Sequence, residues 1–176
     1  MDRLDAFFAH WRSIPRAGLI PALSDYLDRP KPDIQPFSMI VDLGPHGMPV
    51  RLFGTGLTEL LGLDATGFDY TQAVRPSRRA QVLERDAMCA THPCGLRVTL
   101  EAVSGNGRAY TTTVLMLPLL RGPGVYSLVR VSDISNYQTG PAAAEPIHIS
   151  HYADAQWVDI GAGVPATPPW SEGLAD

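Results

Sequence analysis

The clearest periodic pattern in the chain runs from Leu96 to Ala102, where apolar and polar residues alternate. Alternation with a period of two predicts a β-strand with one buried face. Two further strands are expected at residues 108–119 and 125–134, because glycine-containing turns at 104–107 and 121–124 precede them. The region therefore predicts three consecutive antiparallel strands.

A second apolar region begins with residues 37–43 and 50–53, and the turn-forming residues 44–47 separate its two halves. This pattern predicts a β-hairpin. Directly after it, Leu57, Leu60 and Leu61 lie on one stripe of a short helix, for which Thr55 or Gly56 is the expected cap. Gly62 is expected to end that helix in a left-handed conformation.

Two longer segments have helical periodicity. Pro76 opens PSRRAQVLERDAMCAT, in which Ala80, Leu83, Ala87 and Met88 form the expected apolar stripe, and His92-Pro93 ends it. Residues 2–12 predict an amphipathic helix. Its stripe either packs on its own domain or forms an interaction surface for a homodimer or a protein partner, and the residues concerned are Leu4, Phe7, Phe8 and Trp11.

The order of these elements predicts an α+β domain with one five-stranded antiparallel sheet and several helices on one face. We divide the chain into an N-terminal helix and proline-rich connector (1–36), a central domain (37–135) and a proline- and glycine-containing tail (136–176). Within the tail, residues 148–160 carry enough apolar surface to dock on the domain or on a partner.

Composition and charge narrow the expected environment and partners. The net charge of −4 gives no broad attraction for nucleic acid or for an anionic membrane surface. The longest apolar run covers only residues 114–117, and the N-terminus lacks the pattern of a secretory signal. We therefore expect a cytoplasmic protein without a membrane-spanning segment. Cys89 and Cys94 lack the second pair that a zinc site needs and are expected to be reduced and structural.

The segment RLFGTGLTELLGLDATG at 51–67, preceded by PFSMIVDLG at 36–44, resembles the PAS-domain superfamily and in particular small single-domain bacterial PAS-like proteins. The ending VSDIS at 131–135 is similar to the Asp-Ile-Thr signature that closes many PAS domains, with serine here in place of threonine. The resemblance implies a curved five-stranded sheet that encloses a small cavity with its helices. It also implies a signal exit at Asp133 and Ile134.

PAS domains bind flavin, haem, small acids or nothing, and many dimerise, so the resemblance leaves the cofactor unknown. His92 is better explained as a helix-end residue than as a haem ligand, and the cysteine of flavin photochemistry is missing after Gly67. An arginine on a strand can pair with a carboxylate ligand, and hydroxyl groups can hydrogen-bond to it, although both residue types also occur in strands for packing alone. The candidate ligand-binding residues are Arg51, Tyr70, Tyr110, Thr112, Tyr126 and Arg130.

The sequence shows no arrangement of nucleophile and base, no paired carboxylates and no phosphate-binding glycine loop. The leading hypothesis is therefore a cytoplasmic PAS-type sensory or regulatory module, not an enzyme, that binds a small molecule or a protein partner and signals through association. One alternative is a ligand-free interaction or dimerisation adaptor whose side chains fill the cavity. Another is a small α+β enzyme of unknown reaction.

Overall fold

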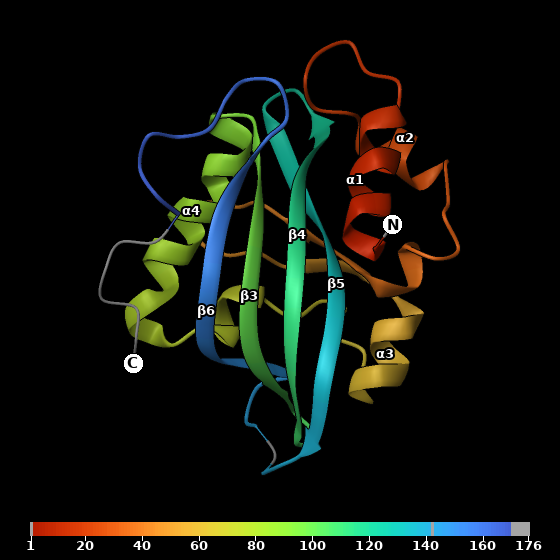
Figure 1. Cartoon of the computed structure of the whole chain (residues 1–176). Helices are drawn as coiled ribbons and strands as arrows, with labels where there is room; N and C mark the ends of the chain where they lie inside the picture. Colours follow the sequence, from red (N-terminus) through yellow and green to blue (C-terminus); the bar gives the residue numbers. More distant parts are fainter. Residues whose placement is uncertain (1, 142, 170–176) are drawn as a thin grey trace.

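A computed structural model of the chain describes residues 2–141 and 143–169, and it shows an α+β protein (Figure 1). The strands form one antiparallel sheet in the order β2-β1-β5-β4-β3-β6. The helices are α1 (Arg3–Ser13), α2 (Leu23–Leu27), α3 (Thr55–Leu61) and α4 (Arg79–Thr91), with short 3₁₀ helices η1 (Gln35–Phe37), η2 (Tyr70–Ala73) and η3 (Pro76–Arg78). The strands are β1 (Ser38–Asp42), β2 (Val50–Phe53), β3 (Cys94–Ser104), β4 (Arg108–Gly122), β5 (Val125–Thr139) and β6 (Ile147–Asp159).

Both faces of the sheet carry a hydrophobic core. On β4, Val114 and Met116 belong to the core shared with α3, η2 and α4, whereas Leu115 and Leu117 belong to the core shared with α1 and α2. We call these the inner and the outer face. This alternation follows from the strand itself, because successive side chains point to opposite sides of a sheet. In Figure 1, α1 and α4 accordingly lie on opposite flanks of the strands.

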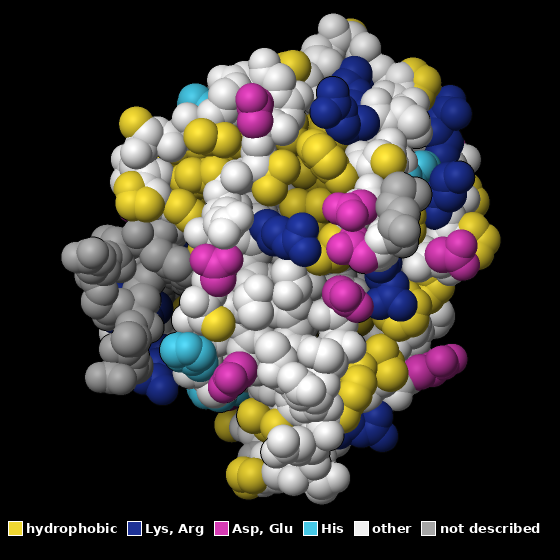
Figure 2. Space-filling view, viewed as in Figure 1, with side chains coloured by type: hydrophobic (Ala, Val, Ile, Leu, Met, Phe, Trp, Pro, Cys, Tyr) yellow, Lys and Arg dark blue, Asp and Glu magenta, His cyan; other side chains and the backbone are white. Residues whose placement is uncertain are grey.

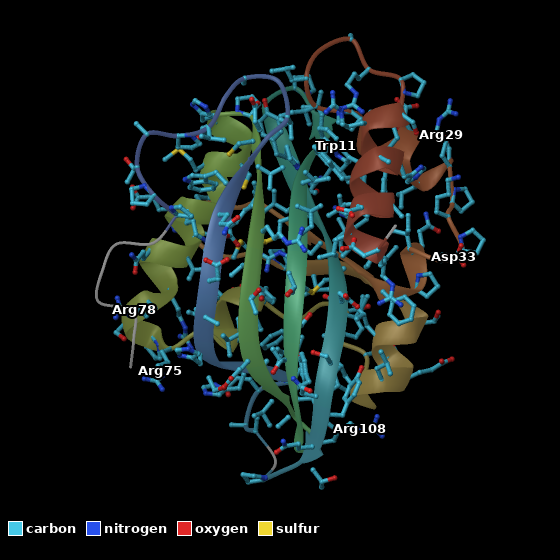
Figure 3. All side chains as sticks on the ribbon, viewed as in Figure 1. Trp11, Arg29, Asp33, Arg75, Arg78 and Arg108 are labelled. Atoms are coloured by element: carbon cyan, nitrogen blue, oxygen red, sulfur yellow. The ribbon has the colours of Figure 1, made fainter. Side chains whose placement is uncertain are left out.

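Helix α1 covers the outer face. The Asp2 carboxylate caps its N-terminus by accepting a hydrogen bond of 2.7 Å from the backbone N–H of Asp5. Trp11 lies between the helix and the strands (Figure 3), and its indole Nε1 donates to the carbonyl of Pro118 at 3.1 Å. Three of the four proposed interaction residues, Leu4, Phe7 and Trp11, are buried here, and only Phe8 stays half-buried. The stripe thus packs on its own domain.

The segment 51–67 forms the end of β2, the helix α3 and the turn after it. The helix begins one residue earlier than expected, because Gly54 is its N-cap. A Cβ atom at Gly54 would lie 2.3 Å from the carbonyl oxygen of Pro36, so only glycine fits there. Gly62 ends the helix with a φ of 72°, as predicted. Arg108 from β4 then donates to the carbonyl oxygens of the last helical turn (Figure 3).

Helix α4 lies where the sequence predicts it, but the predicted apolar stripe was wrong. Ala80 is exposed, and Leu83, Ala87 and Met88 are only half-buried. The helix instead packs through residues at positions i, i+3, i+4, i+7 and i+8, which is a regular helical face. Two of these five residues are charged, which hid the pattern; they are Val82, Arg85, Asp86, Cys89 and Ala90.

The prediction of five strands was one short, because β6 lies within the segment interpreted as a tail. It pairs with β3 along its whole length, from Ile147 opposite Ser104 to Asp159 opposite Cys94. Ile147 and Ile149 are buried in the inner core, so the segment docks on the body of the domain. Two register shifts interrupt the pairing and break the alternation by which strands are recognised. Residues 170–176 of the predicted tail lie outside the described residues.

The surface mixes all side-chain types. Figure 2 shows apolar side chains over the upper part of one face, with acidic and basic side chains among them. Cys89 and Cys94 are unpaired thiols and both are buried. None of the helices in the described part of the chain is long and apolar enough to cross a membrane.

We expect Phe7→Ala to destabilise the protein by about 3–5 kcal/mol, because it removes a buried aromatic side chain and leaves a cavity between α1 and the sheet. Phe7 has 0% exposure. Phe8 is the matched control, since it is half-buried on the same helix and its truncation is expected to cost less than half as much. Urea denaturation followed by circular dichroism measures both. Equal losses for the two variants would contradict the packing described for α1.

Candidate functional site

A small cavity of about 40 Å³ lies between the inner face of the sheet and the helices. Its polar wall consists of Tyr70 from η2, Tyr110 and Thr112 from β4, and Arg130 and Ser132 from β5. Apolar side chains from β1, β2, α3, β3, β4, β5 and β6 complete the enclosure. The polar groups come from separate parts of the sequence and meet only because the sheet brings β4 and β5 side by side.

Four of the six candidate ligand-binding residues line this cavity, namely Tyr70, Tyr110, Thr112 and Arg130. The other two lie elsewhere. Arg51 pairs with Asp42 across the β1–β2 hairpin, through hydrogen bonds of 2.9 Å from Nε and 2.7 Å from Nη2. Tyr126 is half-buried near the start of β5, opposite Leu120, and is not part of the cavity wall.

Arg130 belongs to a buried ionic cluster that joins β5 to α4. Its Nη2 contacts Oδ2 of Asp86, and Oδ1 of the same carboxylate accepts from Arg85 Nε at 2.8 Å and Arg85 Nη2 at 2.7 Å. Arg130 is 2% exposed and Asp86 is 0% exposed. Burial of charges is tolerated only when they are paired in this way. One carboxylate therefore forms ion pairs with two guanidinium groups.

Aromatic rings flank both arginines. The guanidinium carbon of Arg130 lies 3.9 Å from the ring centroid of Tyr70, and that of Arg85 lies 5.7 Å from the ring centroid of Tyr152. Burial raises the pKa of Tyr70, which the nearby Arg130 charge only partly offsets. Burial likewise raises the pKa of Tyr110 and of Tyr152. All three phenols stay protonated at neutral pH.

Sequence reasoning missed Arg85, Asp86 and Tyr152. The predicted apolar stripe of α4 did not include the first two, because charged residues rarely occupy a buried stripe. The signal that would have found them is the spacing of Val82 and Cys89, which places residues 85 and 86 between them on the same face. Tyr152 lies on β6, which was not recognised as a strand.

Hydrogen bonds connect the cavity wall to the start of α1 through β5. Thr112 Oγ1 donates to the carbonyl of Asp133 at 3.1 Å, and Arg3 of α1 donates to the carbonyl of Ser132 at 3.3 Å. The Arg3 guanidinium also lies 3.6 Å from the Asp133 carboxylate and 3.6 Å from the ring centroid of Phe37. Of the two proposed exit residues, Ile134 lines the cavity and Asp133 contacts α1.

A larger hollow lies elsewhere. It has about 490 Å³, is mainly apolar, and lies on the outer side between the proline-rich connector and the β1–β2 hairpin. Its wall holds no charged side chain, whereas Arg130 of the ionic cluster lines the small cavity, so we place the candidate site in the smaller one. Among the described residues no group of three or more His, Cys, Asp or Glu is placed to hold a metal ion. His148 and His151 both lie on strand β6.

Comparison with known proteins gives no match. No family model, no curated protein and no solved structure matches this chain. The PAS resemblance therefore stays a prediction that rests on the residues at 36–67 and 131–135.

Asp42 makes stability depend on acidic pH. Burial alone would raise the pKa of Asp42, but hydrogen bonds from Arg51, Ser127 and Arg121 lower it from 3.8 to about 2. The folded state thus favours the charged carboxylate. Its contribution is complete above the unfolded pKa of about 4 and disappears as the pH falls through 2. We expect Asp42→Asn to be less stable than the wild type at pH 6 and about equal to it near pH 2. Urea denaturation at pH 2–6 tests this, and a constant difference would contradict it.

We expect Asp86→Asn to destabilise the protein by about 3–5 kcal/mol, because it leaves two buried guanidinium groups without their shared carboxylate. Asp133→Asn is the control, since Asp133 is an exposed aspartate whose ion pair with Arg3 is worth at most about 1 kcal/mol. Guanidinium denaturation of both variants at neutral pH provides the comparison. A loss for Asp86→Asn no greater than that for Asp133→Asn would show that the cluster is not a structural requirement.

Proposed function

We propose that the protein is a cytoplasmic PAS-type sensory or regulatory module, which binds a small molecule in the inner cavity and signals through association with a second copy or another protein. The observation that carries this proposal is the convergence of Tyr70, Tyr110, Thr112 and Arg130 on one buried cavity. A concave pocket with a few convergent polar groups is the usual form of a small-molecule site, and at about 40 Å³ this one suits only a very small ligand.

The arrangement of the domain supports the proposal. The strands β2-β1-β5-β4-β3 form a contiguous antiparallel sheet, and α3, η2 and α4 pack on its inner face. The PAS resemblance implies such a sheet and a cavity between it and the helices. Strand β6 extends the sheet beyond that pattern and contributes Ile147 and Ile149 to the cavity wall.

The contacts of β5 offer a route from the cavity to the surface. Ser132 and Ile134 line the cavity, and the residue between them, Asp133, contacts Arg3 at the start of α1. A ligand that shifts β5 by a few tenths of an ångström alters the hydrogen bonds of Arg3. Packed interfaces switch between discrete arrangements, so such a shift is transmitted to α1 and its neighbours.

Of the two alternatives, the ligand-free adaptor has support of its own. The cavity of about 40 Å³ is small and largely filled by the protein's own side chains, which favours a ligand-free adaptor. An enzyme needs a group that gains and loses a proton at the site. Arg130 and Asp86 are held in a buried ion pair, and burial raises the pKa of Tyr70 and of Tyr110, so these groups form a poor acid–base pair.

Native mass spectrometry of the protein purified from cells tests the proposal. We expect a retained small molecule of defined mass, and about fivefold weaker retention in Tyr110→Phe, which loses one buried hydrogen bond to the ligand. Tyr126→Phe is the matched control because Tyr126 lies outside the cavity, and its retention should equal that of the wild type.

The signalling half of the proposal is tested by sedimentation velocity before and after the ligand is removed. Removal is expected to change the association state of the wild type. In Arg3→Gln the ligand should still bind but no longer affect association, because the contact between β5 and α1 is lost. No retained molecule and the same association state in every sample would instead identify an adaptor.

A further inference from the structure

Arg130 has an unsatisfied donor beside the cavity. Its Nη2 is engaged by Asp86, but its Nε is buried and has no hydrogen-bond partner. A buried donor without a partner is unfavourable, and a donor on an arginine more so, because its charge has also lost contact with water. Since Arg130 itself lines the cavity, its guanidinium is the charged group nearest to a molecule bound there.

The residues that line the cavity favour a negatively charged ligand. Arg130 is the one charged side chain among the described residues that line the cavity, and none of them is acidic. Tyr70, Tyr110 and Ser132 also line this space, and both phenols remain protonated because burial raises the pKa of each. Thr112 already donates its hydroxyl proton to the carbonyl of Asp133. The wall thus offers a positive charge and hydrogen-bond donors.

We infer that the cavity binds a small monovalent anion, either a halide or a carboxylate of one or two carbon atoms, held by Arg130 Nε and the tyrosine hydroxyls. This inference rests on the proposed function and names the ligand class of its site. The cavity volume of about 40 Å³ sets the size limit. A cavity needs about 10–15 Å³ of this volume for each water molecule, so there is room for about three, which suits chloride, bromide, formate or acetate and excludes larger acids such as benzoate.

Water is the competing occupant, and charge favours the anion. Hydrogen bonds between an ionised donor and an ionised acceptor are about twice as strong as neutral ones, and the low local dielectric strengthens them further. Asp86 directs only one oxygen at Arg130 and directs the other at Arg85. A second negative charge next to Nε therefore gains attraction that a water molecule lacks. Sulfate and phosphate are disfavoured, since they are larger and cost more to remove from water.

Thermal unfolding of the full chain tests the inference at constant ionic strength. Sodium gluconate, whose anion is too large for the cavity, is replaced stepwise by sodium chloride, bromide, formate or acetate. We expect the small anions to raise the Tm with a saturating dependence on concentration, as linkage requires, while gluconate and benzoate do not. Tyr110→Phe should weaken the apparent affinity about fivefold, through loss of one hydrogen bond to the anion.

Arg97→Met provides the control for general salt effects, because Arg97 is a half-buried strand arginine outside the cavity and its variant should respond like the wild type. Arg130→Met should lose the response. Because that variant also removes the ion pair with Asp86 and is at risk of unfolding, a crystal of the wild type grown with sodium bromide gives independent support. The expected result is an anomalous difference peak within hydrogen-bond distance of Arg130 Nε.

No peak at Arg130, together with identical salt responses for the wild type and Tyr110→Phe, would overturn the inference and assign the cavity to water. A neutral molecule retained in native mass spectrometry would also overturn it, while leaving the proposed function intact. Conversely, anion binding at Arg130 without any change in association would support the inference and contradict the signalling half of the proposed function.

Discussion

The buried carboxylate of Asp86 joins helix α4 to strand β5. It accepts hydrogen bonds from Arg85 on its own helix and from Arg130 on the central strand β5, in a core where all three side chains are buried. Apolar burial is non-directional, so the hydrophobic residues of α4 tolerate small shifts along the sheet. A buried ion pair does not, because displacement leaves a charge without its partner. The cluster therefore sets the position of α4 and fixes Arg130, which lines the cavity.

The elements that were predicted well are those whose pattern is local. The alternation in β3 and the glycine that ends α3 reflect constraints within a few residues, and the structure confirms both. The buried face of α4 and the existence of β6 depend on distant partners. Arg85 and Asp86 are acceptable in a core only because Arg130, more than 40 residues away, completes the cluster. Strand β6 is stabilised by pairing with β3, and its own sequence alternates poorly.

The candidate site was likewise predictable only in part, because some of its features depend on distant partners. Tyr110, Thr112 and Arg130 were proposed for their hydroxyl and guanidinium groups on predicted strands, and the structure places all three at the cavity on the inner face. The strand pattern does not say which arginine has a closer partner. Arg51 instead pairs with Asp42, its neighbour across the hairpin. No pattern of apolar positions predicts that ion pair. Sequence thus supplied the residue types, and the three-dimensional pairing decided which of them share a cavity.

Strand β6 also has a consequence for the behaviour of the chain in concentrated solution. It covers an edge of β3 eleven residues long, which alternates apolar and polar side chains and would otherwise present unpaired backbone groups. Such an edge templates pairing with further chains and promotes aggregation. At the opposite edge, β2 is only four residues long and gives little room for addition. The segment that was predicted to be a tail therefore protects the edge of β3 from pairing with other chains and so opposes aggregation. The folded part of the chain includes all of β6, up to Asp159.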